Sequence, residues 1–374
     1  MNLKVKNFIK KNKEIIIFYF LKKQIIVNLF LFFIKKIKIE KAIGNELLKT
    51  DFHRELNKNI FFTTRSLLHE IGNYTQKKEY PNNKINHLNK KNQEIFFVKS
   101  SQIKEFAKNH LHKINRNFIL ITGDSDTEIR IDIKQKDSEL KNLILDILNN
   151  NKLVSWFSQN LFFEHNKIKS LPHGMDYHTV WEQRKLWENF KFSPSYQEKK
   201  LISILFRSKE FHERENLIFN NWHFSLNHGK RKEIYETVNK KNNFFSEKKL
   251  NRFSNWELQT KYKYIFCPQG KGLDDSRTYE SIILGNVPIR IEDELSKFNA
   301  DLPIIYVKNL EDLNIKFIEA KYLEFKDKKF NFKKLFLDYW RKEINLDFKN
   351  DLNNFQNISM IEFRKNIINY YLVS

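Results

Sequence analysis

Short apolar runs alternate with amphipathic stretches along this chain, and the alternation predicts an α/β protein. A run of about four to eight apolar residues is typical of a buried strand, whereas apolar positions at i, i+3 and i+4 are typical of a helix. The predicted strands are 94–98, 117–122, 153–159, 168–171, 201–206, 264–267, 287–289 and 302–307. The predicted helices include 101–112, 141–148, 211–219, 230–241, 310–322, 332–345 and 358–372. Such alternation indicates parallel sheets with right-handed crossovers.

Residues 262–292 are predicted to form a strand, a tight glycine turn, a helix and a second strand. Pro268 ends the first strand, because proline has no N–H to donate to a sheet. Gly270 and Gly272 follow, and glycine accepts positive φ and lets the backbone approach a ligand closely. The whole chain has only eight glycines and six prolines, so their concentration here indicates a steric requirement. A turn of this kind before a helix is a natural phosphate site; the alternative is an ordinary βα turn.

The helix after this turn carries Arg277 and Glu280, three residues apart and therefore on one face near its N-terminus. An arginine can fork onto a diphosphate, and a carboxylate can accept both hydroxyls of a ribose. Together they predict a sugar-nucleotide site, and the alternative is a surface ion pair that contributes little. Gly285 is expected to end the helix. Its start is expected to be capped by Asp274, Asp275 or Ser276.

Composition adds size and charge to this picture. A chain of 374 residues with 41% hydrophobic residues, 35 of them Phe, has ample material for a packed interior and suggests two domains. Its formal net charge of +22 favours acidic partners such as nucleic acid, anionic lipid, nucleotide or polyanionic glycan. Abundant Lys, Asn, Ile and Phe with scarce Gly, Ala and Pro also fit the codon bias of an AT-rich genome, so the charge is weak functional evidence.

The single cysteine and the N-terminal segment limit the possible classes further. One cysteine, Cys267, excludes an internal disulfide framework and a zinc site made of cysteines. Residues 1–40 are basic and apolar, but Lys22 and Lys23 interrupt the apolar runs and would be costly in a membrane-spanning helix. No cleavage site follows, so a signal peptide is disfavoured. Either this segment lies on an anionic membrane surface of a cytoplasmic protein, or it forms a buried strand and helix.

Polar residues follow several predicted strands, at the carboxyl ends where α/β sheets bind ligands. Asp124 follows strand 117–122 and is a candidate general base for an acceptor hydroxyl; helix capping is the alternative. His173, in the loop 172–176, is a candidate acceptor contact or base, or a solvated histidine. Arg207 and Arg214 follow strand 201–206 and are expected either to neutralise phosphate or to be solvated. No zinc motif is present, and Asp124 with Asp126 is a weak metal signal.

Three segments resemble exostosin-type (family 47-like) glycosyltransferases. FCPQGKGLDDSRTYESIILGNVPI is similar to the family motif, in which an apolar strand precedes P-x-G, an Asp, R-x-x-E-A and L-G-x-x-P-I. ILITGDSD resembles an acceptor-domain strand and its acidic turn. WFSQNLFFEHNKIKSLPHGMDYHT is similar to the segment before the interdomain crossing in such enzymes. The resemblance covers residues 120–290, most specifically 264–289, and the N-terminal third has no match.

The resemblance implies a GT-B fold, in which two Rossmann-like domains with parallel sheets face each other across a cleft. It implies that the second domain holds most of the nucleotide-sugar, that no cofactor is bound, and that a divalent metal is often not required in such enzymes. Ser281 stands where the family more often has alanine. The domains we expect are a basic segment 1–40, an acceptor domain 41–195, a nucleotide-sugar domain 196–345 and a C-terminal helix 346–374. The implied donor-site residues are Gly270, Gly272, Arg277, Glu280 and either Arg207 or Arg214.

We therefore expect a hexosyltransferase-type glycosyltransferase of polysaccharide biosynthesis, which transfers a sugar from a nucleotide-sugar to a glycan or lipid-linked acceptor. Arg277 is expected to stabilise the leaving diphosphate, Glu280 to hold the ribose, and Asp124 to act as the acceptor-side base. One alternative is a non-catalytic polyanion-binding protein on a GT-B scaffold. Nucleic acid is a disfavoured partner, because no RNP pattern, helix-turn-helix or zinc finger occurs. A degenerate GT-B protein is a third possibility, and the intact Arg277–Glu280 pair argues against it.

Overall fold

A computed structural model describes residues 56, 58–72, 85–182, 191–220, 231–238, 240–246 and 250–373. The chain splits into two compact units, Met1–Thr50 and Asp51–Ser374. All the described residues belong to the second unit, so the predictions made for residues 1–40 lie outside them. Within the described ranges, no helix combines the length and the apolar character that crossing a membrane requires.

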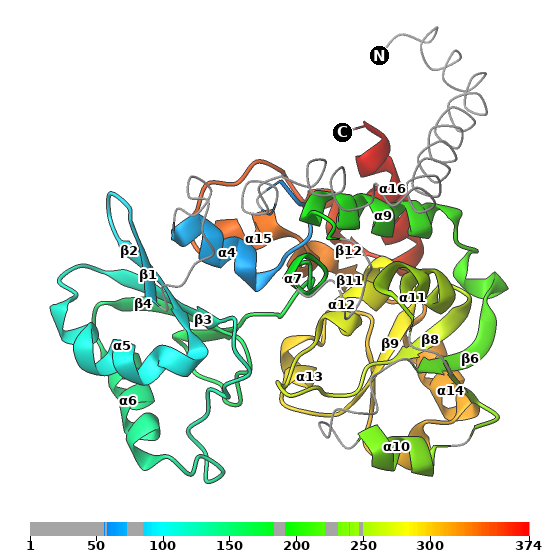
Figure 1. Cartoon of the computed structure of the whole chain (residues 1–374), viewed down its shortest axis with the longest axis horizontal. Coiled ribbons are helices and arrows are strands. Elements are labelled where there is room, and N and C mark those ends of the chain that lie inside the picture. The colour runs from blue at the N-terminus through cyan, green and yellow to red at the C-terminus, as the bar shows by residue number, and fades with distance from the viewer. Residues whose placement is uncertain are drawn as a thin grey trace, which may run out of the picture. The chain divides into compact units, whose positions relative to one another are not determined.

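The first sheet of the described chain has five strands in the order β1-β2-β3-β4-β5 (Figure 1). β1 pairs antiparallel with β2, and the remaining pairs are parallel. The strands are β1 (Ile85–Asn89), β2 (Glu94–Lys99), β3 (Phe118–Gly123), β4 (Leu153–Ser158) and β5 (Ile168–Ser170). The four strands predicted between 94 and 171 are therefore confirmed. β1, which lacks a continuous apolar run because it is an edge strand, was not predicted.

The alternating residues of this sheet pack into two separate cores. One face, with Phe96 and Leu120, packs against α5 (Ile103–Asn109) and α6 (Ser138–Asn149). The opposite face, with Phe97 and Ile121, packs with α4 (Thr64–Ile71) and α15 (Leu337–Glu343). Side chains on a strand alternate between faces, so a strand that is buried on both sides reads as a continuous apolar run. The sheet is therefore covered on both faces.

The second sheet has five described strands in the order β10-β9-β8-β6-β7, and all its pairs are parallel. These strands are β6 (Glu215–Asn220), β7 (Asn243–Phe245), β8 (Tyr262–Phe266), β9 (Val287–Ile291) and β10 (Ile305–Val307). The chain adds β7 on one side of β6 and then returns to add β8 on the other. The loops after β6 and β8 therefore flank the topological switch point, where open α/β sheets bind ligands.

Two predictions near the start of this sheet are wrong. The segment 201–206 is not a strand but part of α9 (Pro194–Arg207), and 211–219 is not a helix but the short η4 (Phe211–Glu213) followed by β6. A six-residue apolar run fits a buried helix as well as a strand. The decisive signals for a helix stand upstream, where Pro194 occupies the first turn and the Ser193 hydroxyl accepts from the Tyr196 N–H.

Further helices pack around the second sheet and into a shared core. The core that α9 enters also includes residues of the N-terminal part, such as Phe61 and Tyr177. The remaining helices are α7 (His178–Glu182), α10 (Arg231–Thr237), α11 (Arg252–Gln259), α12 (Ser276–Ile283), α13 (Leu295–Phe298), α14 (Ile315–Phe325) and α16 (Met360–Val373). The short elements are η2 (Ser100–Gln102), η3 (Leu111–Lys113), η5 (Leu310–Asp312), η6 (Phe332–Leu335), η7 (Asn353–Phe355), β11 (Phe330–Asn331) and β12 (Gln356–Ile358).

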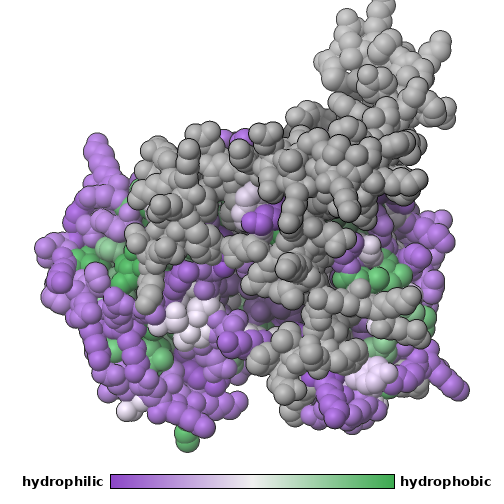
Figure 2. Space-filling view, in the orientation of Figure 1, coloured by the Kyte–Doolittle hydropathy of each residue, from purple (hydrophilic) through white to green (hydrophobic). Residues whose placement is uncertain are grey.

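The C-terminal part of the chain returns to the first sheet after the second sheet is complete. Trp340 on α15 lies with its ring centroid 5.4 Å from that of Phe62 and 6.4 Å from that of Phe157. The described residues thus form a mixed α/β structure with two mainly parallel sheets, as predicted, while the domain boundaries stay a prediction. Figure 2 shows a largely hydrophilic face with small, separate apolar areas.

Candidate functional site

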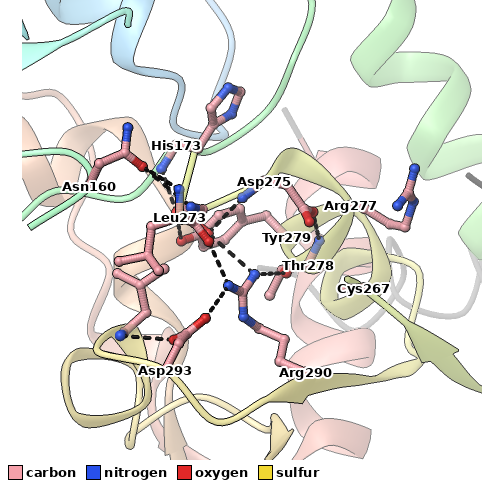
Figure 3. A network of polar contacts seen from close by, with 12 residues as sticks. Asn160, His173, Cys267, Leu273, Asp275, Arg277, Thr278, Tyr279, Arg290 and Asp293 are labelled. Atoms are coloured by element: carbon pink, nitrogen blue, oxygen red, sulfur yellow. Dashed lines mark hydrogen bonds and ion pairs between the residues drawn. The ribbon is translucent and has the colours of Figure 1, made fainter. Parts of the chain in front are cut away.

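The glycine turn between β8 and α12 is docked onto the loops that follow strands of the first sheet (Figure 3). The backbone N–H groups of Leu273 and Asp274 donate to Asn160 Oδ1 at 2.9 and 3.4 Å. Asn160 Nδ2 in turn donates to the Ser125 carbonyl at 3.0 Å. The His173 N–H donates to Asp274 Oδ2 at 2.8 Å. The turn is therefore fixed by residues more than a hundred positions earlier in the sequence.

The two glycines of the turn have different roles from those expected. Neither Gly270 nor Gly272 has positive φ, so the expected use of that region is wrong. A Cβ on Gly272 would lie 3.1 Å from Asn160 Oδ1 and 3.3 Å from Asp126 Oδ1, whereas a Cβ on Gly270 would meet only an Arg231 nitrogen at 3.7 Å. A Cβ at position 272 would therefore crowd the docking contact, which a glycine leaves free. Gly285, with φ of 73°, ends α12 as predicted.

A buried network of charged side chains also holds the glycine turn in place. Asp275 caps α12 by accepting from the Thr278 N–H at 3.2 Å. Arg290, 1% exposed, donates to the Leu273 carbonyl at 2.7 Å and to Asp293 Oδ2 at 2.8 Å. Burial alone would lower the pKa of Arg290, but nearby carboxylates, Asp293 first, raise it above its usual value. Arg290 therefore stays charged and holds the turn rigidly.

Arg277 and Arg231 lie on the two helices that flank the switch point. Arg277 is half-buried in the first turn of α12, after β8, and points away from the Arg290 network (Figure 3). Arg231 begins α10, after β6, and is 8% exposed. Within the described ranges neither guanidinium has an ion pair, and Arg231 Nε is buried without a hydrogen-bond partner. Burial, and then the charge of Arg277, lower the pKa of Arg231 to about 10.

These charges make the turn a candidate anion site. Asp275 acts against the repulsion between the two arginines, but its one negative charge is smaller than their sum. The N-terminus of α12 adds partial positive charge and unsatisfied N–H groups. An anion placed here would offset the repulsion and give the arginines hydrogen-bond acceptors. Arg231 was missed because its position depends on β6, which was misassigned. The basic cluster Lys230–Lys232 after the apolar run Leu217–Phe219 is the signal that could have found it.

Glu280 is not beside Arg277 in an open site. It is 5% exposed, and its two oxygens accept from Arg252 Nη1 at 2.9 Å and from Trp256 Nε1 at 2.8 Å. Arg252 also donates to Asp176 Oδ2 at 3.0 Å. The ribose role of Glu280 stays a prediction that would require it to exchange these partners.

Arg207 and Arg214 lie away from the switch point. Arg207 ends α9, where its Nε donates to the Ser203 carbonyl at 3.2 Å. Arg214 is 4% exposed and donates to the carbonyl of Leu284, at the C-terminal end of α12, at 2.9 Å. Burial, and then the charge of Arg364, lower the pKa of Arg214 to about 9. Both arginines were expected at the phosphate site because the segment 201–206 was predicted to be the first strand of the second sheet.

A cavity of about 200 Å³ lies where the loops of the first sheet meet the glycine turn. Asp124, at φ of 50°, lines it, but its Oδ1 is 2.8 Å from Arg65 Nε and its Oδ2 is 3.2 Å from Lys99 Nζ. His173 lines it too, with Nδ1 3.2 Å from the Gly174 carbonyl. The structure therefore brings Asp124 and His173 to one cavity beside the turn, with Asp124 already ion-paired.

A second cavity of about 550 Å³ opens at the carboxyl ends of β8, β9 and β10. Its volume is in the usual range for small-molecule sites. Gln269, from the glycine turn, lines it together with the carboxylates of Glu292, Asp293 and Glu311. This cavity adjoins the turn on the side of the second sheet. Among the described residues, no group of three or more His, Cys, Asp and Glu side chains is arranged to hold a metal ion.

Comparisons with known proteins find no matching family and a distant similarity to a solved structure. No protein-family model and no curated protein matches the chain. Among solved structures it is similar to "Crystal Structure of alpha1,3-Fucosyltransferase", with 13% identity, covering 75% of this chain and 88% of that chain. The TM-score is 0.31, too low to carry an argument. The resemblance to exostosin-type enzymes therefore rests on the motif residues alone.

Proposed function

We propose that this protein is a glycosyltransferase that moves a sugar from a nucleotide-sugar to a glycan or lipid-linked acceptor. One observation carries the proposal. Arg231 and Arg277 lie on the two helices that flank the topological switch point of a parallel sheet, close enough for the charge of one to act on the other, and neither has an ion pair within the described ranges. A diphosphate fits this arrangement, because each guanidinium can donate two parallel hydrogen bonds to phosphate oxygens.

The same groups would serve the reaction as well as binding. When the bond from the sugar to the diphosphate breaks, negative charge develops on the leaving oxygens. Arg231, Arg277 and the N–H groups at the start of α12 would stabilise that charge without rearranging, since Arg290 and Asn160 already fix the turn. No metal is needed for this role in the proposal. The nucleoside would occupy the cavity of about 550 Å³ beside Gln269.

The finer assignment follows the motif. We propose that the two sheets belong to the two Rossmann-like domains of a GT-B enzyme of the exostosin type. Gly270 and Gly272 would then lie along the diphosphate, and the cavity lined by Asp124 and His173 would take the acceptor. The motif, the switch-point arginines and the position of the two cavities on either side of one turn all support this assignment.

The test compares nucleotide binding in matched variants. Thermal unfolding of wild type, Arg231→Ala, Arg277→Ala and Lys136→Ala is followed with UDP, GDP, CMP and inorganic pyrophosphate. Lys136 is exposed and lines neither cavity, so the Lys136→Ala substitution removes one positive charge without changing a residue of the site. We expect at least one nucleotide to raise the Tm of wild type and of Lys136→Ala. Each arginine variant should bind about tenfold or more weakly, since a hydrogen bond to a charged group contributes about 1.5–3 kcal/mol.

A second experiment tests whether the protein cleaves a nucleotide-sugar. Mass spectrometry of UDP-, GDP- and CMP-sugars incubated with the protein should show hydrolysis of one donor class, reduced in both arginine variants. No protection by any nucleotide, or equal protection in all four proteins, would contradict the proposal.

The net charge of +22 supports one other candidate function, polyanion binding without catalysis. Tight binding to nucleic acid or anionic glycan that weakens steeply with salt, with no donor hydrolysis, would favour it.

A further inference from the structure

A histidine and a carboxylate form a pair at the cavity of about 200 Å³. His178 begins α7, and its Nδ1 lies 2.8 Å from Asp176 Oδ1. The Thr179 N–H donates to the same oxygen at 3.0 Å, and Arg252 Nη2 donates to Asp176 Oδ2 at 3.0 Å. Burial alone would raise the pKa of Asp176, but the charges of His178 and Arg252 lower it well below its usual value.

The ionised Asp176 carboxylate orients the imidazole ring through Nδ1. The carboxylate accepts the proton on Nδ1, so the neutral ring carries its free lone pair on Nε2. Within the part of the chain that the structure describes, Nε2 has no hydrogen-bond partner. His178 has a side chain that is 21% exposed, and it lines the cavity together with Asn160 and Asp274, which hold the glycine turn. A group in this cavity therefore meets the histidine on one side and the turn on the other.

The other acids and bases that line this cavity are already engaged. Asp124 is ion-paired with Arg65 and Lys99. Asp126 Oδ2 lies 3.7 Å from Lys271 Nζ. Asp274 accepts from the His173 N–H, the Tyr279 hydroxyl and the Asp275 N–H. The His173 ring makes no ion pair within 4 Å in the described ranges, and its Nδ1 lies 3.2 Å from the Gly174 carbonyl. His178 alone among these groups combines an orienting carboxylate with an unoccupied ring nitrogen, which is the usual arrangement of an activated base.

We propose that His178, oriented by Asp176, is the general base that activates the acceptor hydroxyl in a transfer that inverts the anomeric configuration. The assignment rests on the proposed function. In the step, Nε2 takes the hydroxyl proton while the acceptor oxygen forms a bond to the anomeric carbon. The bond from that carbon to the diphosphate oxygen breaks, and the electron pair leaves with the diphosphate, whose charge Arg231 and Arg277 stabilise. This role replaces the one first assigned to Asp124.

The test uses the nucleotide-sugar that wild type hydrolyses fastest in the donor screen, with water as the acceptor. The kcat of donor hydrolysis is measured against pH for wild type, His178→Ala, His178→Gln, Asp176→Asn and His112→Ala. His112 is exposed on η3 and serves as the matched histidine control. The charged and titratable groups that share this cavity with His178 or pair with Asp176 are Asp176, Arg252, Arg65, Asp124, Asp126, His173 and Asp274.

We expect both His178 variants to lose about a hundredfold in kcat, since a positioned base contributes about 10²–10⁴, with nucleotide protection unchanged. The acidic limb of the pH profile should disappear in both and persist in His112→Ala. Asp176→Asn should retain that limb with a reduced kcat. NMR of the first-formed sugar should show inversion.

If wild type binds no nucleotide, the proposed function fails and this assignment with it. If wild type hydrolyses a donor but His178→Gln keeps its kcat and acidic limb, or the sugar retains its configuration, only the role of His178 is overturned.

Discussion

Arg277 and Glu280 stand three residues apart on α12, and yet their environments are opposite. Arg277 has no ion pair within the described ranges, whereas both oxygens of Glu280 accept hydrogen bonds from buried donors. Arg277 is therefore the ligand candidate of the two. Glu280 anchors α12 to α11 through Arg252 and Trp256.

Removal of Glu280 should therefore affect stability before binding. In Glu280→Ala we expect a loss of about 3–5 kcal/mol in the free energy of unfolding, because a buried Arg252 loses a charged partner. Urea denaturation checks this against Glu257→Ala, an exposed carboxylate on the neighbouring helix, which should be close to neutral. A Glu280→Ala protein with wild-type stability and no nucleotide protection would instead restore the ribose assignment.

At the scale of single residues, the sequence predicted those residues whose role depends on neighbours that are close in the sequence. A cap at Asp274, Asp275 or Ser276 and an end at Gly285 follow from positions a few residues apart, and the structure has Asp275 as the cap and Gly285 at the end. Asp176 was noted only as part of the loop 172–176, and His178 was given no role. What distinguishes them is Arg252, 76 positions away, and that contact leaves no local pattern.

The glycine turn is the element on which both cavities depend. It contributes Gln269 to one and Asp274 to the other, and Asn160 holds it through two backbone N–H groups. Scarcity of glycine correctly indicated a steric requirement, but the requirement applies to Gly272 and its cause is a contact with the first sheet. A distant contact of this kind cannot be inferred from turn chemistry.

The two glycines therefore give opposite stability predictions. Gly272→Ala should lower the free energy of unfolding by about 1–3 kcal/mol, because the new methyl group crowds Asn160. Gly270→Ala should be neutral or stabilise by up to about 1 kcal/mol, since its φ is not positive and its surroundings are open. Chemical denaturation of the two variants measures the difference. Equal effects would mean that the turn is not docked as the structure has it.

At the scale of the whole molecule, the chain returns from the second sheet to cover the first. α15 belongs to the same core as strands β2, β3 and β4, although about 180 residues separate Phe157 from Trp340. The sequence predicted a helix over 332–345 and placed it within the nucleotide-sugar domain. The sequence pattern indicated the apolar face of this helix, but it does not indicate which sheet the face covers.

The Trp340→Ala substitution tests whether α15 packs against the first sheet. We expect a loss of about 3–5 kcal/mol in the free energy of unfolding, as for other large buried aromatic residues. Hydrogen exchange should show faster exchange in β3 and β4, where Phe157 and Ile121 lose their neighbour. The control is Phe348→Ala, since the Phe348 residue is about half exposed at 49%. Faster exchange confined to β8 and β9 would contradict the packing.

Arg252 touches Asp176 with one nitrogen and Glu280 with another, which has a consequence for how this protein tolerates change over evolution. Loss of Arg252 leaves two buried carboxylates without their shared cation, and loss of either carboxylate leaves Arg252 with only one, whereas joint replacement by neutral residues removes these unbalanced charges. The three effects should therefore be far from additive in combination. Related chains are expected to keep all three residues or to exchange all three together, so these positions should covary although 104 residues separate the first from the last.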